Sequence, residues 1–328
     1  MKALVTGATG FLGFHVTRRL LRSGHEVRAF VRPSSIRRGL DDVGEICVGD
    51  IEDAAAVSHA VAGCDVVFHL AGRASFWNGD AGLMWRQHVV GTSHVAEACR
   101  ESRARLVYTS SVAALGPPQP DGSIGDETSS FSWGGLRNPY AAAKHEAGRR
   151  IAAAVRMGLD AVTVLPATTF GPYDFNYSVA RMIENIDAGL IFIYPPGGIT
   201  VAHADAVAEG HLRAAQLGRT GARYVLGGEH LTFRDLFARI ARRLGRRPPW
   251  LPVPPRALRI LGAGGSLAST LARRDLGLTS TSARLSCLHL YYDSAKAIHE
   301  LGYEPRSADD ALTQACCWYR DGANARAA

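Results

Sequence analysis

The stretch TGATGFLG, residues 6–13, joins an apolar run to an amphipathic run close to the start of the chain. Its three glycines have the spacing G-x-x-G-x-x-G, which predicts a tight turn from a buried strand into a helix. Gly7 permits the turn, Gly10 lets the backbone approach a ligand, and Gly13 lets the helix pack closely on the strand. A pyrophosphate would meet the free N–H groups of that helix, so the stretch predicts a dinucleotide site. An ordinary strand–helix turn is the alternative.

Strand-like and helix-like runs continue to alternate as far as residue 166, which predicts an α/β fold with a doubly wound parallel (Rossmann) sheet. We expect residues 1–168 to form the dinucleotide-binding domain. The predicted strands are 2–6, 26–31, 45–48, 65–70, 105–110 and 161–166, and the predicted helices are 11–23, 54–62, 83–102 and 139–157.

Beyond residue 168 strand-like and helix-like runs no longer alternate regularly, and we expect residues 169–328 to form a smaller, mostly substrate-binding domain. Residues 222–228 are predicted to return as a strand to the main sheet. Further helices are predicted at 179–188, 204–217, 231–244, 257–278 and 294–301, followed by a frayed end from Asp321. Asp205 is the expected N-cap of its helix, with His203 as a structural partner.

The composition excludes several classes of protein. The 328 residues contain no apolar run long enough to span a membrane, and a core strand follows Met1 at once, so we expect a cytoplasmic protein. The six cysteines show no metal-ligand spacing, and no metal site is predicted. The net charge of +7 comes from scattered arginines without interleaved aromatic residues, so no nucleic-acid partner is expected.

Tyr140 and Lys144 stand four residues apart on a predicted helix and therefore share one of its faces. An ammonium group beside a phenol favours the phenolate, so we expect Lys144 to lower the pKa of Tyr140 toward neutrality. The preceding strand ends in Ser110 and Ser111, at the edge where parallel sheets bind ligands. A serine hydroxyl there could bond the same substrate oxygen that Tyr140 protonates. A solvent-facing pair is the alternative.

The end of the second predicted strand favours a phosphorylated cofactor. An NAD-specific fold places an acidic side chain here for the ribose 2′-hydroxyl, but this chain has Val31 and then Arg32. A guanidinium pairs with a 2′-phosphate, so Arg32, with Arg37 nearby, predicts NADP(H) in preference to NAD(H).

Two further strand ends carry candidate cofactor contacts. Asp50 and Ile51 follow the third strand, where they could meet an adenine ring, although an Asp in this place is equally typical of a turn. Leu70, Ala71 and Gly72 close the fourth strand and would let the backbone run close to the cofactor.

With these elements in this order, the chain resembles the extended short-chain dehydrogenase/reductase family of NAD-dependent epimerases and dehydratases over nearly its full length. The matching residues are 6–13, 108–111, Tyr140 with Lys144, and 166–172. Within that family the chain looks most like the dihydroflavonol-reductase-like branch, which includes hopanoid-associated sugar epimerase-like proteins. Arg32 and residues 108–116, 224–232 and 295–305 carry the closer match.

The resemblance implies that Tyr140 is the acid/base, that Lys144 holds the nicotinamide ribose and tunes Tyr140, and that Ser111 orients the substrate oxygen. His88 departs from the family, which has an asparagine there for a relay water, and could relay a proton or simply pack. The implied cofactor site consists of Thr6, Gly7, Thr9, Gly10, Phe11, Leu12, Gly13, Arg32, Arg37, Asp50, Ile51, Leu70, Ala71, Gly72, Ser110, Tyr140, Lys144, Pro166, Ala167, Thr168 and Thr169.

Aromatic residues cluster after the fourth and sixth strands and are candidates for an apolar substrate pocket. They include Phe76, Trp77, Phe170 and Phe175, although core packing is equally compatible with each. Arg73, directly after the fourth strand, either meets the substrate or faces solvent.

Three functions remain open from the sequence. The first is an NADP(H)-dependent reductase or dehydrogenase that transfers a hydride between the nicotinamide and a carbonyl or secondary alcohol of a mainly apolar substrate. The second is a sugar-nucleotide epimerase or dehydratase with retained NAD, and the third is a non-catalytic dinucleotide sensor. The two long helices at 83–102 and 139–157 also suggest, by analogy, a homodimer contact.

Overall fold

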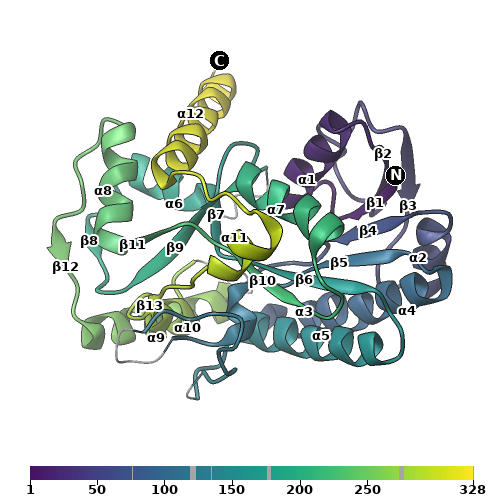
Figure 1. The fold of residues 1–328 in the computed structure, drawn as a ribbon. Coiled ribbons are helices and arrows are strands. Elements are labelled where there is room, and N and C mark those ends of the chain that lie inside the picture. Colours follow the sequence, from purple (N-terminus) through teal and green to yellow (C-terminus); the bar gives the residue numbers. More distant parts are fainter. Residues whose placement is uncertain (76, 119–122, 134, 176–178, 273–276, 328) are drawn as a thin grey trace.

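The computed structural model describes residues 1–75, 77–118, 123–133, 135–175, 179–272 and 277–327 (Figure 1). Its centre is a seven-stranded sheet in the order β10-β6-β5-β4-β1-β2-β3, and every neighbouring pair in it is parallel. The predicted doubly wound sheet is therefore confirmed. The strands are β1 (Lys2–Thr6), β2 (Glu26–Val31), β3 (Glu45–Val48), β4 (Val66–His69), β5 (Arg105–Thr109), β6 (Ala161–Pro166) and β10 (Arg223–Leu226).

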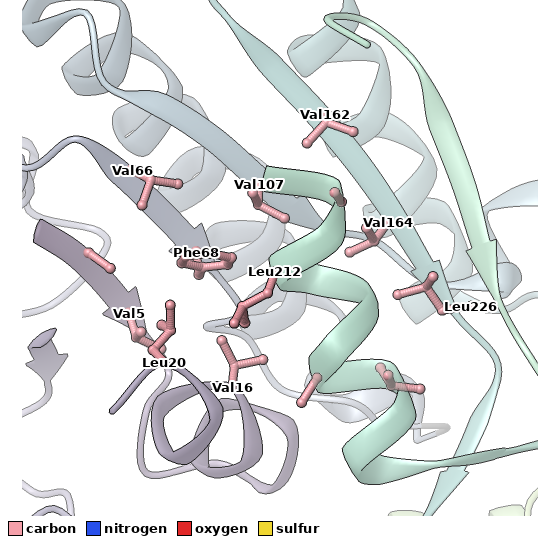
Figure 2. Close-up of a cluster of buried hydrophobic side chains, with 14 of the residues drawn as sticks. Val5, Val16, Leu20, Val66, Phe68, Val107, Val162, Val164, Leu212 and Leu226 are labelled. Carbon is pink, nitrogen blue, oxygen red and sulfur yellow. The ribbon is translucent and has the colours of Figure 1, made fainter. Parts of the chain in front are cut away.

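Helices cover both faces of this sheet because successive strand residues point to opposite sides. Val5 packs in one buried cluster with side chains of the covering helices, whereas its neighbour Leu4 packs in the cluster on the other face. Figure 2 shows the first cluster, in which Leu20 and Leu212 meet Val5 and Phe68. The first face is covered by α1 (Phe11–Arg22), α7 (Ala204–Leu217) and α11 (Ala295–Leu301), the second by α2 (Ala54–Val61), α4 (Thr92–Ser102) and α5 (Pro139–Arg156) (Figure 1).

The predicted helix at 83–102 is divided into three segments. The short helix α3 (Ala81–Trp85) follows a 3-10 turn, η1 (Asn78–Asp80), and runs into the π-helical segment η2 (Arg86–Gly91) before α4 begins. π-Helical turns occur frequently at functional sites. A second 3-10 turn, η3 (Val112–Leu115), follows β5.

The second half of the chain builds a smaller unit beside the main sheet. Its four-stranded sheet consists of β7 (Thr168–Phe170), β9 (Gly198–His203), β11 (Glu229–Thr232) and β13 (His289–Leu290). A buried cluster joins it to α6 (Ala180–Asp187), α8 (Phe233–Arg243) and α12 (Ala308–Ala327). The remaining elements are β8 (Ile193–Tyr194), β12 (Leu251–Pro252), α9 (Pro255–Ala272) and α10 (Ser280–Leu285).

Two local predictions were wrong. The helix α12 was not predicted, and it extends to Ala327 where a frayed end was expected from Asp321. Three of its buried residues are alanines, Ala308, Ala311 and Ala315, and they give a weaker apolar pattern than the neighbouring Leu312. The cap of α7 is His203, whose Nδ1 accepts a hydrogen bond from the Asp205 backbone N–H at 3.1 Å.

Asp205 instead lies in the first turn of α7, where its carboxylate bonds Nδ1 of His15 at 2.7 Å. The helix expected at 257–278 is observed as α9, and residues 273–276 lie outside the described part of the chain. Among the described helices, none is long and apolar enough to cross a bilayer.

Candidate active site

The start of α5 places Tyr140 and Lys144 at the carboxyl edge of the main sheet. Asn138 caps this helix by accepting a hydrogen bond from the Ala141 backbone N–H at 3.1 Å, and Pro139 occupies the first helical position. Both residues are typical of a helix start. Tyr140 therefore lies in the first turn, with Lys144 one turn later on the same face.

Lys144 is buried, with only 5% of its surface exposed. Its ammonium group donates to the backbone carbonyl of Thr109 at 2.7 Å and lies 5.4 Å from the ring centre of Tyr108. Burial lowers the pKa of Lys144 to about 7. Because no ion pair to Lys144 is present among the described residues, this side chain can exchange a proton near neutral pH.

The expected lowering of the pKa of Tyr140 is not observed. Burial of its hydroxyl raises the pKa, and a hydrogen bond with Ser111 lowers it by a smaller amount. The expectation was wrong because the enclosure that desolvates Tyr140 also disfavours the charged form of Lys144. In the ligand-free protein Tyr140 is thus a protonated phenol, ready to act as a hydrogen-bond or proton donor.

Ser111 is held in place by the turn that follows β5. Its side chain caps η3 by accepting a hydrogen bond from the Ala113 backbone N–H at 3.2 Å. Ser110 is buried and its backbone N–H bonds the Val164 carbonyl at 2.8 Å. The structure thus brings Ser111 close enough to Tyr140 to affect its pKa, and Lys144 lies one turn further along the same helix.

His88, on the π-helical segment η2, lies against the same tyrosine. Its ring is 2% exposed and meets the ring of Tyr140 edge-on, with 5.6 Å between the centroids. Nε2 bonds the backbone carbonyl of Arg73 at 2.8 Å, and Nδ1 has no hydrogen-bond partner within the described ranges. Burial, with Lys144 nearby, holds the pKa of His88 well below its usual value. His88 is therefore neutral, with one ring nitrogen free to accept a hydrogen bond.

The glycine turn fits a bound pyrophosphate. Gly7 has φ +75°, and a Cβ at this position would lie 2.8 Å from the backbone nitrogen of Ala71. A Cβ on Gly13 would lie 2.0 Å from the carbonyl oxygen of Gly7, so only glycine permits this close packing. The N-cap of α1 is Gly10, which supplies no side-chain cap. The first N–H groups of α1 are consequently available to an anion.

The other residues predicted to bind the cofactor at this turn differ in their contacts and exposure. The Thr6 hydroxyl bonds Nδ1 of His69 at 2.7 Å and accepts from the Ala71 backbone N–H at 3.3 Å, which joins the ends of β1 and β4. Thr9 and Leu12 are partly exposed, whereas Phe11 is buried. Leu70 and Ala71 are also partly exposed beside the turn.

Arg32 and Arg37 extend into solvent from the loop after β2, and neither forms an ion pair with another described residue. In the same loop, Arg38 lies over the ring of Phe175, 6.0 Å from its centroid. The loop therefore presents cationic groups beside α1, and two of them are not neutralised by the chain itself.

Asp50 and Ile51 have structural contacts in the ligand-free protein. An Asp50 carboxylate oxygen accepts from the Glu52 backbone N–H at 3.0 Å, as in a turn. Ile51 is 7% exposed and packs against Gly91.

The end of β6 leads directly into β7. Pro166 pairs with Leu226 of β10, and the Ala167 backbone N–H donates to the Leu226 carbonyl at 3.1 Å. The Thr169 hydroxyl donates to the Ala167 carbonyl at 3.0 Å, whereas Thr168 is partly exposed. Of these residues, Thr168 is therefore the most accessible to a ligand.

The candidate substrate residues do not form one group. Phe170 is 0% exposed within the core of the smaller unit, so its assignment to a pocket was wrong in this structure. Phe175 contacts Phe14 and Trp318. The Arg73 guanidinium forms an ion pair with Asp80 at 3.2 Å, and Phe76 lies outside the described residues.

Trp77 lines a cavity of about 310 Å³ that the sequence did not reveal. This volume is close to the lower end of the range for small-molecule sites. The Thr281 hydroxyl, from the cavity wall, donates to the Arg137 carbonyl at 2.8 Å, next to the cap of the helix that carries Tyr140. The lining residues are Trp77, Asn78, Gly79, Ser266, Thr270, Thr279 and Thr281.

Known proteins are similar to this chain over nearly its whole length. A putative dihydroflavonol 4-reductase of Synechocystis sp. is 32% identical over 97% of this chain and 94% of its own length. Sterol demethylase protein B of Methylococcus capsulatus is 32% identical over 98% of this chain and 99% of its own length. The crystal structure of a nucleoside-diphosphate-sugar epimerase from Pseudomonas aeruginosa superposes with a TM-score of 0.80 at 29% identity, covering 98% of both chains.

A family model for the NAD dependent epimerase/dehydratase family matches residues 3–227, which include the glycine turn, Ser111, Tyr140 and Lys144. The chain therefore belongs to this family of oxidoreductases, which work with a nicotinamide dinucleotide.

Proposed function

We propose that this protein is an NADP(H)-dependent reductase that acts on a carbonyl group, or in reverse on a secondary alcohol, of a mainly apolar substrate. The observation that carries the proposal is the proximity of Ser111 to Tyr140, which affects the pKa of the tyrosine, beside the buried Lys144. Two hydroxyl groups can then bind one substrate oxygen, and one of them can give it a proton.

In the reducing direction, the bound dinucleotide supplies the hydride that the carbonyl carbon receives. Tyr140 donates its proton to the carbonyl oxygen, and Ser111 holds the same oxygen by a second hydrogen bond. When Lys144 carries its proton, its ammonium group one helical turn away would stabilise the phenolate that Tyr140 becomes. In the oxidising direction the proton moves from the alcohol oxygen of the substrate to Tyr140.

The preference for NADP(H) rests on Arg32 and Arg37. Both guanidinium groups are exposed and form no ion pair within the described ranges, and β2 ends without a carboxylate at Val31. They can therefore bind a 2′-phosphate without first breaking an internal contact.

Trp77 is the large apolar side chain of the cavity near the start of α5, whose other lining residues are small or polar, so the choice of an apolar substrate rests chiefly on the relatives. The names of two relatives, a putative dihydroflavonol 4-reductase and a sterol demethylase protein, support the same substrate class. A structural relative is called a nucleoside-diphosphate-sugar epimerase. The competing function is therefore that of a sugar-nucleotide epimerase that retains its NAD, and the experiment below distinguishes the two.

The experiment is to denature the purified protein, identify any released dinucleotide by mass, and titrate the cofactor-free protein with NADPH and NADH. We expect little retained cofactor and tighter binding of NADPH, after which ketones and aldehydes with apolar frameworks are screened as substrates. Stoichiometric, tightly held NAD would overturn the proposal and direct the screen to nucleotide sugars.

The grooved surface formed by α4 and α5 is the proposed site of a homodimer contact. The groove has a volume of about 490 Å³ and is lined by alanines such as Ala152 together with charged side chains such as Glu97 and Arg150, which could pair with those of a second copy. Sedimentation of the protein at micromolar concentration tests this contact, and a monomer would refute it.

A further inference from the structure

Helix α9 has apolar side chains on two opposite sides. On one side, Leu258 and Gly262 are buried, and Gly262 packs against Ala283 of α10. On the other side, Ile260, Leu267 and Leu271 are 74%, 62% and 77% exposed. Their spacing of seven and four residues places these three on one stripe of the helix. We call Ile260, Leu267 and Leu271, with the half-exposed Leu261 beside them, the α9 stripe.

The surroundings of the α9 stripe carry positive charge. Of the seven arginines in residues 236–272, five lie on or just after α8, where Arg239, Arg243 and Arg246 form ion pairs, and two lie on α9 itself. Arg256 and Arg259, on α9 itself, are exposed and form no ion pair with a described residue. Trp250, 71% exposed, precedes the helix. Exposed leucines, an aromatic residue and arginines together are typical of a helix that lies in the interface of a membrane.

An anionic lipid surface fits this helix better than a second copy of the chain. In a two-fold symmetric contact the same surface meets itself, so the arginines around one stripe would face those around the other. An anionic bilayer instead offers phosphate groups to Arg256 and Arg259 and acyl chains to the leucines. We propose that the α9 stripe docks the protein on the surface of an anionic lipid bilayer, without crossing it.

The position of the candidate cavity connects docking on the lipid surface with entry of the substrate. Ser266 and Thr270 lie on the flank of α9, between the stripe and the buried side, and line the same cavity as Trp77. α9 lies at the periphery of the molecule, at the lower left of Figure 1. Docking would bring the cavity close to the lipid, from which an apolar substrate could enter. Only this last step rests on the proposed function, because lipid binding requires no catalysis.

The test is co-sedimentation of the full-length protein with phosphatidylcholine vesicles that contain or lack phosphatidylglycerol. We expect binding to the anionic vesicles that weakens as salt is added. Leu267→Gln with Leu271→Gln should weaken it by roughly thirtyfold, because two leucines no longer enter the acyl region. Arg256→Gln with Arg259→Gln should weaken binding to the anionic vesicles by on the order of tenfold.

A matched control is Leu217→Gln with Ile298→Gln, which changes side chains that are 52% and 42% exposed on α7 and α11. This variant should bind vesicles like the unaltered protein. All three double variants should unfold at nearly the same temperature and bind NADPH equally well, since every altered side chain is exposed. These two readouts separate loss of docking from loss of the fold or of the proposed function.

Three results would overturn the proposal. The first is that the unaltered protein stays in the supernatant with anionic vesicles. The second is that the leucine variant binds as tightly as the unaltered protein. The third is that the unaltered protein sediments as a dimer that the leucine variant dissociates, because a second copy would then cover the α9 stripe.

Discussion

The rings of His88 and Tyr140 meet at an angle of 72° with 5.6 Å between their centroids, although the two residues come from different helical segments. Gly72 lies on another side of the histidine, where a Cβ would come within 2.1 Å of its Cε1 atom. The histidine ring is therefore enclosed between the end of β4 and Tyr140, and its neutral state follows from this enclosure.

Replacement of His88 tests whether this ring positions Tyr140. We expect His88→Ala to lower the free energy of unfolding by about 2–3 kcal/mol, because a buried ring is lost, and to lower kcat about tenfold with KM little changed. Activity assays below the unfolding temperature measure kcat and KM, and urea titrations measure the free energy of unfolding. His94→Ala, on the same helical run, is the control and should leave kcat unaltered. Equal kcat in the His88 variant and the unaltered protein would show that the ring only packs.

Removal of the Tyr140 hydroxyl should abolish most of the hydride-transfer activity. For Tyr140→Phe we expect kcat to fall by about 10³-fold, which is within the usual range for a general acid, while the Kd for NADPH stays within about twofold. Ser111→Ala should cost about 10²-fold, because one hydrogen bond to the substrate oxygen is lost. Tyr194→Phe, a partly buried tyrosine of β8, serves as the control. Substantial turnover by Tyr140→Phe would assign the proton to another group.

The pKa of Lys144 makes stability depend on pH. The pKa falls from 10.5 to about 7 on folding, so between these values the unfolded chain holds a proton that the folded chain lacks. The free energy of unfolding should therefore rise with pH across this window, by up to about 1.4 kcal/mol per pH unit from this group. Below this pH window, Lys144 is protonated in both the folded and the unfolded chain, so its contribution to the free energy of unfolding stays constant.

Urea unfolding of the ligand-free protein at several pH values within this window measures the effect. Lys144→Met should lose the slope that Lys144 contributes, whereas Lys296→Met, at a partly exposed lysine that bonds the Arg223 carbonyl, should retain it. Parallel pH profiles for the Lys144 variant and the unaltered protein would contradict the lowered pKa.

The selection of the cofactor should depend on Arg32. Arg32→Ala is expected to raise the Kd for NADPH by about 10- to 100-fold, because a charge-assisted contact to the 2′-phosphate is lost, and to leave the Kd for NADH unchanged. Fluorescence titrations of the cofactor-free protein measure both constants. Arg22→Ala, at the exposed end of α1, controls for a general loss of positive charge. An equal loss of affinity for NADPH and NADH would mean that Arg32 does not bind the 2′-phosphate.

The parts of the site that are local in sequence could be predicted from it. The turn that requires Gly7 and the pair formed by Tyr140 and Lys144 both follow from spacing within one strand–helix unit. The cavity could not be predicted, because Trp77 shares its lining with Ser266 and Thr270 from a distant part of the chain, and serine and threonine carry no distinctive pattern.

Other differences have equally specific causes. Phe170 belongs to an aromatic cluster whose spacing suits a pocket or a core, and only the packing of β7 against its neighbours decides between them. The raised pKa of Tyr140 required knowledge of burial, since spacing alone shows the neighbouring charge but not the desolvation that opposes it.

The pairing of β10 with β6 has a consequence for biosynthesis. β6 ends at Pro166, yet the strand that covers its outer edge is Arg223–Leu226, and α7, which packs over the same strands, is also translated later. A nascent chain that has emerged only through residue 168 therefore exposes an unpaired strand edge and an open apolar face, a state prone to aggregation. We expect a fragment of residues 1–168 to require a chaperone or to precipitate, so the dinucleotide-binding half matures only after the later segment joins it.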